Sequence, residues 1–430
     1  MLILDFNDSE LRIADGDSVL ARAPGFAFLE GKDFVLGESA AAKSRLNPRA
    51  SYRNFWEQLD QQPLNRAAGR AQSHADIAYF HLQSLWQRAC ATFSGIPDGV
   101  ILVVPAQYGA ERLSLLLGIA QACAIPVQGV VDSAVLAAAT QQYFPCQYLD
   151  ISLHRVYRSQ ITAEGALHNA GELSQQGLVW CYEQLIKWIA AQFMAETRFD
   201  PLHEAASEQR LFDELPIWLK GFSQAERLSL SLSAGQRQHR IEVGRAQVIE
   251  QLQPLYQVLD TVAQAEQPLL LSHRFSVLPG LAERLNARQL SSEASLMFAA
   301  ERAAELVSDP AAPVWIKQLQ PQASRVEAAE PEPNSQPTTP RATHLLYEHS
   351  AYPLYPDGLA LGAEPAAIGA SSAASVRVEG GRVVLKTGAT SPELQINGVA
   401  WEGGECELRP GDELRCGTQH YRLICVRDGC

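Results

Sequence analysis

The chain has 430 residues, and its 35 lysines and arginines against 48 aspartates and glutamates give a net charge of −13. This length predicts two or three domains at ~150 residues per domain, and 47% hydrophobic with 19% charged residues is typical of a folded globular protein rather than a disordered one. The acidic balance argues against a nucleic-acid-binding protein, because a phosphate backbone requires a cationic surface.

Short strands open the chain, and alternating helices and strands follow them. Apolar residues alternate with polar ones near the start, whereas after residue 75 they recur at three- and four-residue spacing, which is typical of an amphipathic helix. A continuous apolar run at 99–105 predicts a strand that is buried on both faces. The expected elements of this half are strands at 2–6, 10–14, 18–23, 34–37, 99–105 and 127–131, and helices at 75–94, 110–123 and 133–142.

The same pattern restarts near residue 147. The run 147–152 (Gln-Tyr-Leu-Asp-Ile-Ser) resembles 2–7 (Leu-Ile-Leu-Asp-Phe-Asn), and each is an apolar strand that ends close to an aspartate. The other expected elements of this half are strands at 155–163, 166–170 and 268–271, a hairpin at 227–243, and helices at 177–197, 202–215, 245–264 and 278–285. Two copies of one strand-and-helix plan predict an internal duplication.

A dense run of prolines marks a boundary after residue 308. Proline removes backbone donors, and few apolar residues remain here to form a core. Only 314–316 (Val-Trp-Ile) is apolar enough to dock on another surface. The expected organisation is a large domain at 1–308 with lobes of about 1–142 and 143–308, a Pro/Glu-rich linker at 309–341 and a small all-β domain at 342–430.

Several spaced segments of residues 1–300 resemble the actin/hexokinase/DnaK superfamily, most of all the ATPase domain of DnaK-type chaperones. The clearest are 103–108 (Val-Val-Pro-Ala-Gln-Tyr), which is similar to the family's V-P-A-x-[FY] segment, and 131–139 (Val-Asp-Ser-Ala-Val-Leu-Ala-Ala-Ala), which is similar to its E-P-x-A-A-A connector. The resemblance implies an α/β fold of two duplicated, ribonuclease-H-like lobes. In that family ATP and Mg²⁺ bind between the lobes.

The family approaches the phosphates with two glycine turns, because glycine lets backbone N–H groups come close to an anion. The first turn, D-[LF]-G-[TS] in the family, is Asp5-Phe6-Asn7-Asp8 here, which keeps the acid, loses the glycine and adds a negative charge. The second, D-[IL]-G-G-G-T, is 150–155 (Asp-Ile-Ser-Leu-His-Arg), without any glycine. Both phosphate turns are therefore degenerate.

Other family positions are altered as well. A glycine pair is half kept at Gln176-Gly177, the adenosine turn at 272–279 has lost both glycines, and Asp132 stands where the family has a catalytic glutamate. The degenerate nucleotide positions are Asn7, Asp8, Ser152, His154, Gly177, Ser272 and His273.

Two interpretations of the acidic residues follow. In one, Asp5, Asp132 and Asp150 coordinate Mg²⁺ in a modified ATPase. In the other, they persist as strand-end residues that bond nearby backbone. The loss of glycine at three nucleotide contacts favours the second interpretation, so we expect a pseudo-ATPase that needs neither cofactor nor metal.

The C-terminal region resembles a forkhead-associated (FHA) domain, a phosphothreonine-binding β-sandwich. The run 408–417 is similar to the family's closing L-x-x-G-D-x-[IL]-x-[IVL]-G segment. Ser372 and Asn397 match residues with which the family binds peptides, but Ala363 replaces the arginine that pairs with phosphate, and Ser375 replaces a structural histidine. Binding of an unphosphorylated partner, or a purely structural role, is therefore favoured over phosphopeptide binding.

We thus expect a non-catalytic, actin/DnaK-like scaffold or adaptor that presents protein-binding surfaces within a larger assembly. The alternative is an ATP-binding, DnaK-type chaperone-like ATPase whose FHA-like module directs it to protein or phosphoprotein partners. No apolar run approaches the ~20 residues of a membrane span, and no basic region precedes the first apolar stretch as in a signal peptide. A cytoplasmic protein without direct membrane insertion is the expectation.

Overall fold

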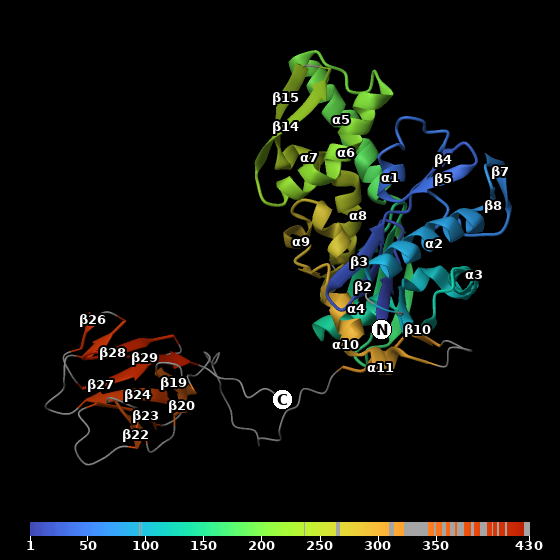
Figure 1. Ribbon diagram of the computed structural model, residues 1–430. Coiled ribbons are helices and arrows are strands. Elements are labelled where there is room, and N and C mark those ends of the chain that lie inside the picture. Colours follow the sequence, from blue (N-terminus) through green and yellow to red (C-terminus); the bar gives the residue numbers. More distant parts are fainter. Residues whose placement is uncertain are drawn as a thin grey trace. The chain divides into compact units, whose positions relative to one another are not determined.

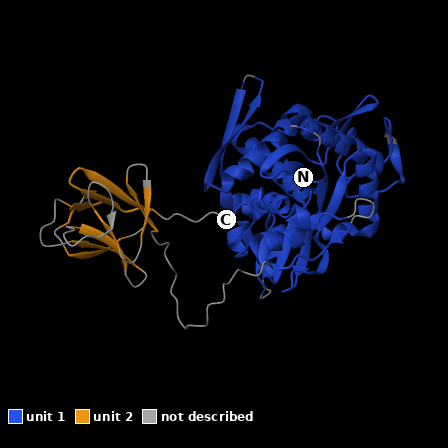
Figure 2. Cartoon of the chain, turned by 60° about the horizontal axis from the view of Figure 1, so that its bottom comes forward, with its two compact units in different colours: residues 1–325 blue, residues 326–430 orange. Residues whose placement is uncertain are grey.

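The computed structural model divides the chain into two compact units, residues 1–325 (unit 1) and 326–430 (unit 2) (Figure 2). The structure describes residues 1–93, 95, 97–235, 237–263, 267–308 and 314–321 of unit 1, and 343–347, 350–354, 358–361, 366–367, 374–379, 382–387, 394–397, 399–401, 404–408 and 411–424 of unit 2. The protein has a mixed α/β fold, with mixed sheets in unit 1 and antiparallel sheets in unit 2. Among the described helices, none is long and apolar enough to cross a membrane.

Unit 1 is built on two main sheets. The first has the strand order β18-β10-β9-β1-β2-β3, and the second β13-β12-β11-β16-β17. The strands of the first are β1 (Leu2–Asp5), β2 (Leu11–Asp15), β3 (Ser18–Ala23), β9 (Val100–Val104), β10 (Val127–Asp132) and β18 (Trp315–Ile316). Those of the second are β11 (Cys146–Ile151), β12 (Val156–Ile161), β13 (Leu167–Ser174), β16 (Leu269–Leu271) and β17 (Arg288–Gln289).

The two sheets share one topology. Counted from the first strand of each half, both run 3-2-1-4-5, with β18 added at the edge of the first sheet. In each, the second strand is antiparallel to its neighbours and the fourth and fifth strands are parallel to the first. The two central strands, β1 and β11, therefore occupy equivalent places in their halves.

Helices and small strands surround the two sheets (Figure 1). The helices are α1 (Glu38–Ala41), α2 (His74–Thr92), α3 (Gly109–Ala122), α4 (Ser133–Gln141), α5 (Leu178–Thr197), α6 (Ala205–Phe222), α7 (Arg245–Gln251), α8 (Gln253–Ala263), α9 (Leu281–Arg284), α10 (Ala294–Glu301) and α11 (Ala303–Leu306), with 3₁₀ turns η1 (Ala106–Tyr108) and η2 (His273–Val277). The small strands are β4 (Ala27–Glu30), β5 (Asp33–Leu36), β6 (Ser51–Tyr52), β7 (Pro63–Ala68), β8 (Ala71–Ser73), β14 (Arg227–Ala234) and β15 (Arg237–Gly244).

Two helices differ from the sequence-based expectation at a proline: one continues through it, and the other is interrupted near it. The expected helix at 202–215 continues as α6 through Pro216 to Phe222, since Trp218 and Leu219 carry its buried face past the proline. The expected single helix at 245–264 is two helices, α7 and α8. Pro254 lies in the first turn of α8, where its missing N–H costs no helical hydrogen bond, but it could not donate one within a longer helix.

Successive side chains of the central strand β1 lie on opposite faces of its sheet and pack in two different cores. Leu2 and Leu4 of β1 pack in the core of their own half, whereas Ile3 lies in a second core that also contains Tyr148 of β11. A third cluster joins Phe26 and Phe28, from the first half, to the helices of the second half. The two halves of unit 1 are thus joined by continuous apolar packing at two levels.

A short segment within the range expected to be linker belongs to unit 1. Trp315 and Ile316 form β18, which pairs with β10 in parallel, and Gln318 forms a β-bridge to Ala166 of the second half. The Leu167 N–H donates to the Lys317 carbonyl oxygen at 2.9 Å. Residues 314–321 therefore reach from the sheet of one half to that of the other.

Unit 2 contains two antiparallel sheets with the orders β20-β19-β29-β28-β25-β26 and β22-β21-β23-β24-β27. Residues from both sheets, including Leu345, Val376, Leu385 and Leu423, share one apolar core. Its strands are β19 (His344–Tyr347), β20 (Ser350–Pro353), β21 (Leu359–Ala360), β22 (Ala366–Ala367), β23 (Ala374–Glu379), β24 (Arg382–Thr387), β25 (Leu394–Ile396), β26 (Val399–Ala400), β27 (Glu405–Leu408), β28 (Glu413–Cys416) and β29 (Gln419–Ile424).

Candidate functional site

Two buried aspartates meet between the halves of unit 1, each carried by a central strand. Asp5 ends β1 and Asp150 lies near the end of β11. Arg274, from η2, bridges them: its Nη2 is 2.6 Å from Asp5 Oδ2 and its Nη1 is 3.4 Å from Asp150 Oδ2. Arg12, from β2, donates to the same Asp5 oxygen through Nη2 at 2.6 Å and Nε at 3.2 Å. Side chains of this protein therefore neutralise both aspartates.

The ionisation of these groups follows from burial and charge pairing. Asp5 and Arg274 are 7% and 8% exposed, so neither charge is well solvated. Burial opposes ionisation of Asp5, but Arg274 and Arg12 outweigh it and hold the pKa of Asp5 well below its usual range. Burial likewise lowers the pKa of Arg274, but Asp5 and Asp150 raise it above the ordinary arginine value. Within this buried ion network, Asp5 and Arg274 therefore stay charged at neutral pH.

Asn7 and Asp8, at the first degenerate turn, bond to the second turn across the interface. The Asn7 side chain donates from Nδ2 to Asp150 Oδ2 at 3.0 Å and to the Ile151 carbonyl oxygen at 3.2 Å. Asp8 Oδ1 accepts a hydrogen bond of 2.8 Å from the Leu153 N–H. Burial raises the pKa of Asp8 to about 6. A carboxyl group of the chain itself thus contacts the backbone of the second turn.

The second degenerate turn closes onto the start of α5. Carbonyl oxygens of 152–154 accept hydrogen bonds from the N–H groups of Gly177, Leu178 and Val179 at 2.8–3.1 Å. The approach is so close that a Cβ at Gly177 would lie 2.4 Å from the backbone of His154 and Arg155. These first N–H groups of the helix, which form an anion site in many proteins, are already used by the turn.

Asp132 and Ser272 lie buried near this interface without contacting the ion network. Asp132 caps α4, with Oδ1 accepting from the N–H groups of Ala134 and Val135 at 2.9 and 3.1 Å. Its Oδ2 and the Ser272 hydroxyl have no hydrogen-bond partner among the residues that the structure describes. Burial raises the pKa of Asp132 to about 6. Asp132 therefore has a structural role as a helix cap.

The remaining expected site residues have different environments. The His154 ring contacts the Arg53 carbonyl oxygen through Nε2 at 2.9 Å. Burial, reinforced by Arg274, lowers the pKa of His273 well below the ordinary histidine value. In unit 2, Asn397 donates to Asp412 Oδ1 at 2.9 Å and accepts from the Glu413 N–H at 2.9 Å, so its side chain joins two turns of its own unit. Ser372 and Ala363 lie outside the described residues.

The interface has little free space at the degenerate turns. The cavity lined by residues that include Asn7, Asp8 and Ser152 has a volume of about 30 Å³, enough for a water molecule but far below the ~300–1,000 Å³ of ordinary ligand pockets. The two halves also contact one another through Arg45, which pairs with Glu183 at 2.7 Å and lies 4.9 Å from the Phe212 ring centroid. The interface is closed by both polar and apolar contacts.

These residues do not fit a bound Mg²⁺–nucleotide. Asp5 and Asp150, the two acids best placed to approach a metal, are paired with guanidinium groups, and Asp8 adds a negative charge beside them. Within the part of the chain that the structure describes, no group of three or more His, Cys, Asp or Glu side chains is placed to hold a metal ion. The arrangement joins the two halves through charged groups of the chain itself, and the cavity of about 30 Å³ at the two turns is far smaller than a nucleotide pocket.

Sequence reasoning missed the two arginines of the network. Arg12 is the only charged residue within the buried positions of β2, Leu11–Ala14, and such a residue requires a buried partner. That signal was present in the sequence. No such signal pointed to Arg274. It lies in the 272–279 turn, and its proximity to Asp5 depends on how the two halves pack.

No protein-family model matches this chain, and no curated protein sequence is significantly similar to it.

Proposed function

We propose that unit 1 is an actin/DnaK-like domain of two ribonuclease-H-like lobes and that it acts as a non-catalytic scaffold. The shared 3-2-1-4-5 strand order of the two sheets supports the duplicated fold, because it repeats strand for strand from β1 and from β11. The resemblance of 103–108 and 131–139 to the DnaK-type segments supports the choice of family. Such a fold carries many functions, so the activity must be argued from the site itself.

The observation that carries the proposal is that the chain fills the site with its own groups. The Arg274 guanidinium lies between Asp5 and Asp150, where a cation would have to bind, and the Asp8 carboxylate accepts the Leu153 N–H, which a phosphate oxygen would otherwise accept. A nucleotide would have to displace an ion network that is charge-paired and hydrogen-bonded. The domain therefore keeps the two-lobed fold in a single closed state.

Calorimetric titration of the full-length protein with Mg-ATP and with Mg-ADP, beside thermal melting, tests this function. We expect no binding heat and no change in the melting temperature. Nucleotide at 100 times its Kd would stabilise the fold by ~2.7 kcal/mol, so saturable binding would be visible in the melt. Such binding would refute the scaffold proposal and favour the chaperone-like ATPase alternative.

For unit 2 we propose an FHA-like sandwich that binds protein partners without phosphate recognition. Its paired antiparallel sheets and shared core support the sandwich, and the engagement of Asn397 with Asp412 and Glu413 leaves that side chain little capacity for a peptide. A phosphothreonine peptide library should show no gain in binding over its unphosphorylated counterpart. Phosphate-dependent micromolar affinity would contradict the proposal.

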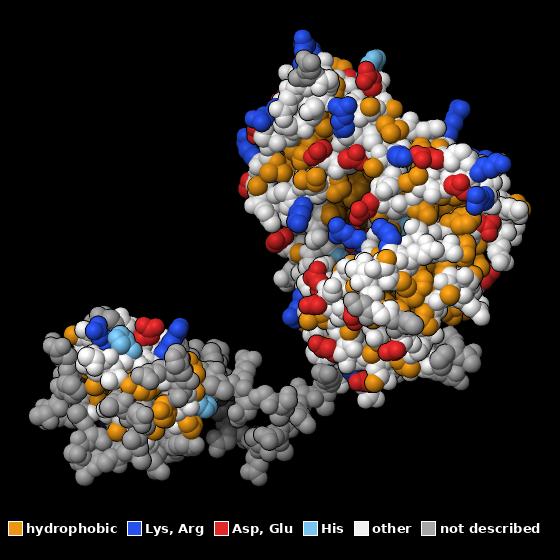
Figure 3. Space-filling view, viewed as in Figure 1, with side chains coloured by type: hydrophobic (Ala, Val, Ile, Leu, Met, Phe, Trp, Pro, Cys, Tyr) orange, Lys and Arg blue, Asp and Glu red, His pale blue; other side chains and the backbone are white. Residues whose placement is uncertain are grey.

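The proposed partners are proteins rather than nucleic acids. On the face of unit 1 drawn in Figure 3, basic and acidic side chains are intermixed, and the described side chains there form no continuous basic tract. The net charge of −13 also argues against nucleic-acid binding, because it repels a phosphate backbone. We place the protein in the cytoplasm, as a scaffold within a larger assembly.

A further inference from the structure

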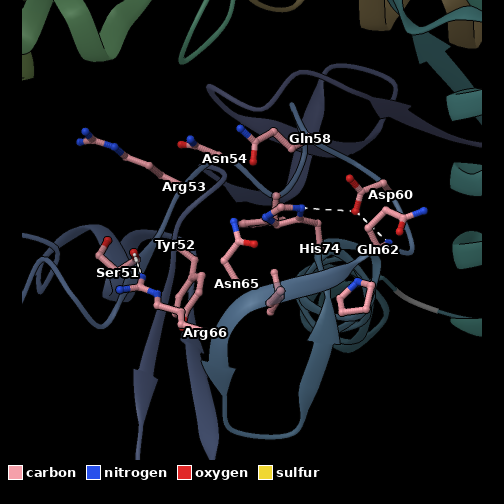
Figure 4. A pocket seen from close by; sticks show the side chains of 13 residues that line it. Ser51, Tyr52, Arg53, Asn54, Gln58, Asp60, Gln62, Asn65, Arg66 and His74 are labelled. Atoms are coloured by element: carbon pink, nitrogen blue, oxygen red, sulfur yellow. Dashed lines mark hydrogen bonds and ion pairs between the residues drawn. The ribbon is translucent and has the colours of Figure 1, made fainter.

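A second hollow lies in the first half of unit 1, away from the ion network. It has a volume of about 530 Å³, which is within the range of ligand pockets. Strand β6, at the edge of the three-stranded sheet β5-β4-β6, forms one wall, and β7 forms the opposite wall. The loop between them supplies the rim (Figure 4). The hollow is thus a trough, open to solvent, between two strands.

Amide side chains dominate the polar lining of this trough. Asn54, Gln58, Gln62 and Asn65 all line it, and none of these four side chains has a hydrogen-bond partner in the described protein. Figure 4 shows Gln58 and Asn65 beside His74, whose Nδ1 faces Asp60 Oδ1 at 3.5 Å, and Asn54 farther along the same rim. Each amide offers both donors and an acceptor, so the trough suits a ligand that presents both kinds of group.

Two charged residues of the trough lie close to partners of their own. Arg53 pairs with Glu183 at 3.6 Å, and Asp60 Oδ1 lies 3.5 Å from His74 Nδ1. Arg66 is the exception: its Nη2 donates to the Ser51 carbonyl oxygen at 3.2 Å, and no acidic side chain of the described residues pairs with it. The Arg66 guanidinium can therefore donate to a single carboxylate, whereas phosphate sites use clusters of cations.

The aromatic surface of the trough is already covered. The Arg66 guanidinium lies 4.4 Å from the centroid of the Tyr52 ring, and Phe34 packs edge-on against the same ring at 5.7 Å. Phe55 is only 1% exposed. No open aromatic face is therefore offered to a sugar ring or a nucleobase, although the amides alone would suit a carbohydrate.

We propose that this trough binds an extended, unphosphorylated peptide segment of a partner protein, with an acidic side chain of that segment paired to Arg66. The backbone of an extended peptide alternates N–H donors and C=O acceptors, which the amides of Asn54, Gln58 and Asn65 can satisfy. The proposal rests on the scaffold function, since it gives that function a partner surface. It does not depend on how the ion network behaves.

The test is selection of peptides from a phage-displayed library of unphosphorylated sequences against the full-length protein. We expect enriched peptides with a shared motif that includes Asp or Glu. Affinity measured by fluorescence polarisation should fall about tenfold or more for the triple variant Asn54→Ala/Gln58→Ala/Asn65→Ala, because the hydrogen bonds of three amides to the peptide are lost together. Arg66→Gln should weaken the same peptides but leave their Asp→Asn or Glu→Gln forms unaffected.

Asn169→Ala is the matched control, because Asn169 is an exposed asparagine on β13 outside the trough. It should bind the peptides as the wild type does. Equal binding by the triple variant, failure to enrich any peptide, or a glycan array ligand that depends on these amides would each overturn the proposal. Because Mg-ATP titration addresses the ion network separately, failure of the peptide site and failure of the scaffold function can be told apart.

Discussion

At the scale of single residues, Arg274 joins the two halves of unit 1 through ion pairs. Its guanidinium contacts Asp5 and Asp150, which lie in different halves, and all three side chains are at most 10% exposed. Removal of one partner from such a network leaves an uncompensated buried charge, which is far more costly than an exposed ion pair. Loss of Arg274 should therefore be costly mainly because buried carboxylates would remain without this charge partner.

We predict that Arg274→Met lowers the free energy of unfolding by about 3 kcal/mol or more, because Asp150 loses the guanidinium paired with it and Asp5 loses one of its two. Urea denaturation measures the change. Adding Asp150→Asn to the same chain should restore part of the loss, since it removes the unpaired charge. Arg237→Met, at an exposed position on β15, is the control and should stay within about 0.5 kcal/mol of wild type. A loss in Arg274→Met that Asp150→Asn does not reduce would contradict this account.

Asp132 gives a pH-dependent prediction. Burial raises its pKa in the folded protein from 3.8 to about 6, so its stabilising contribution is present below pH 4 and is lost as the pH rises through 6. Asn can cap a helix as Asp does but carries no charge. Asp132→Asn should therefore gain stability relative to wild type between pH 4 and pH 7, by about 3 kcal/mol at most.

Denaturation of both proteins at several pH values measures this difference. Asp8 also has a pKa of about 6 when folded, but it is present in both proteins and its effect cancels. A stability difference that stays constant from pH 4 to pH 7 would show that Asp132 titrates normally.

At the scale of elements, a close backbone approach fixes where α5 begins. The turn at 152–155 contacts the first N–H groups of α5, and Gly177 leaves room for it. Gly177→Ala should lower the free energy of unfolding by about 1–3 kcal/mol, because the new methyl group would overlap the backbone of His154 and Arg155. Gly118→Ala, within α3 where nothing lies within 4 Å, should instead be neutral or stabilise by up to about 1 kcal/mol. Equal effects of the two substitutions would rule out a specific approach at Gly177.

The sequence predicted elements well where one residue pattern decided the structure. The apolar run at 99–105 is β9, buried at every position, and the helical spacing after residue 75 is α2. Prediction failed where tertiary packing decided, as in α6, whose buried face continues beyond Pro216. The ion network could not be predicted for the same reason, because it also depends on tertiary packing. Asp5 and Asp150 were visible as strand-end acids, but their pairing with Arg274 depends on contacts between residues more than 100 positions apart.

At the scale of the whole of unit 1, residues 314–321 form a strap across the two halves. The strap pairs with β10 through Trp315 and Ile316, and Leu319 donates to the Gly165 carbonyl oxygen at 3.1 Å in the second half. Gly165 has a φ of +73°, and a Cβ there would lie 1.9 Å from the Leu319 carbonyl oxygen. The second half therefore accepts the strap only because this turn carries glycine.

We predict that Gly165→Ala releases the strap along its whole length rather than at the turn alone. Hydrogen exchange should quicken at the Leu167 amide, which donates to the Lys317 carbonyl oxygen, and also at the amides of β18 on the sheet of the other half. Gly171→Ala, on β13 with open space around the new methyl group, controls for substitution in the same half and should leave β18 unchanged. Faster exchange confined to 165–167 would show that the strap segments are independent. Faster exchange at both ends would show that the strap opens as one unit along both halves of unit 1.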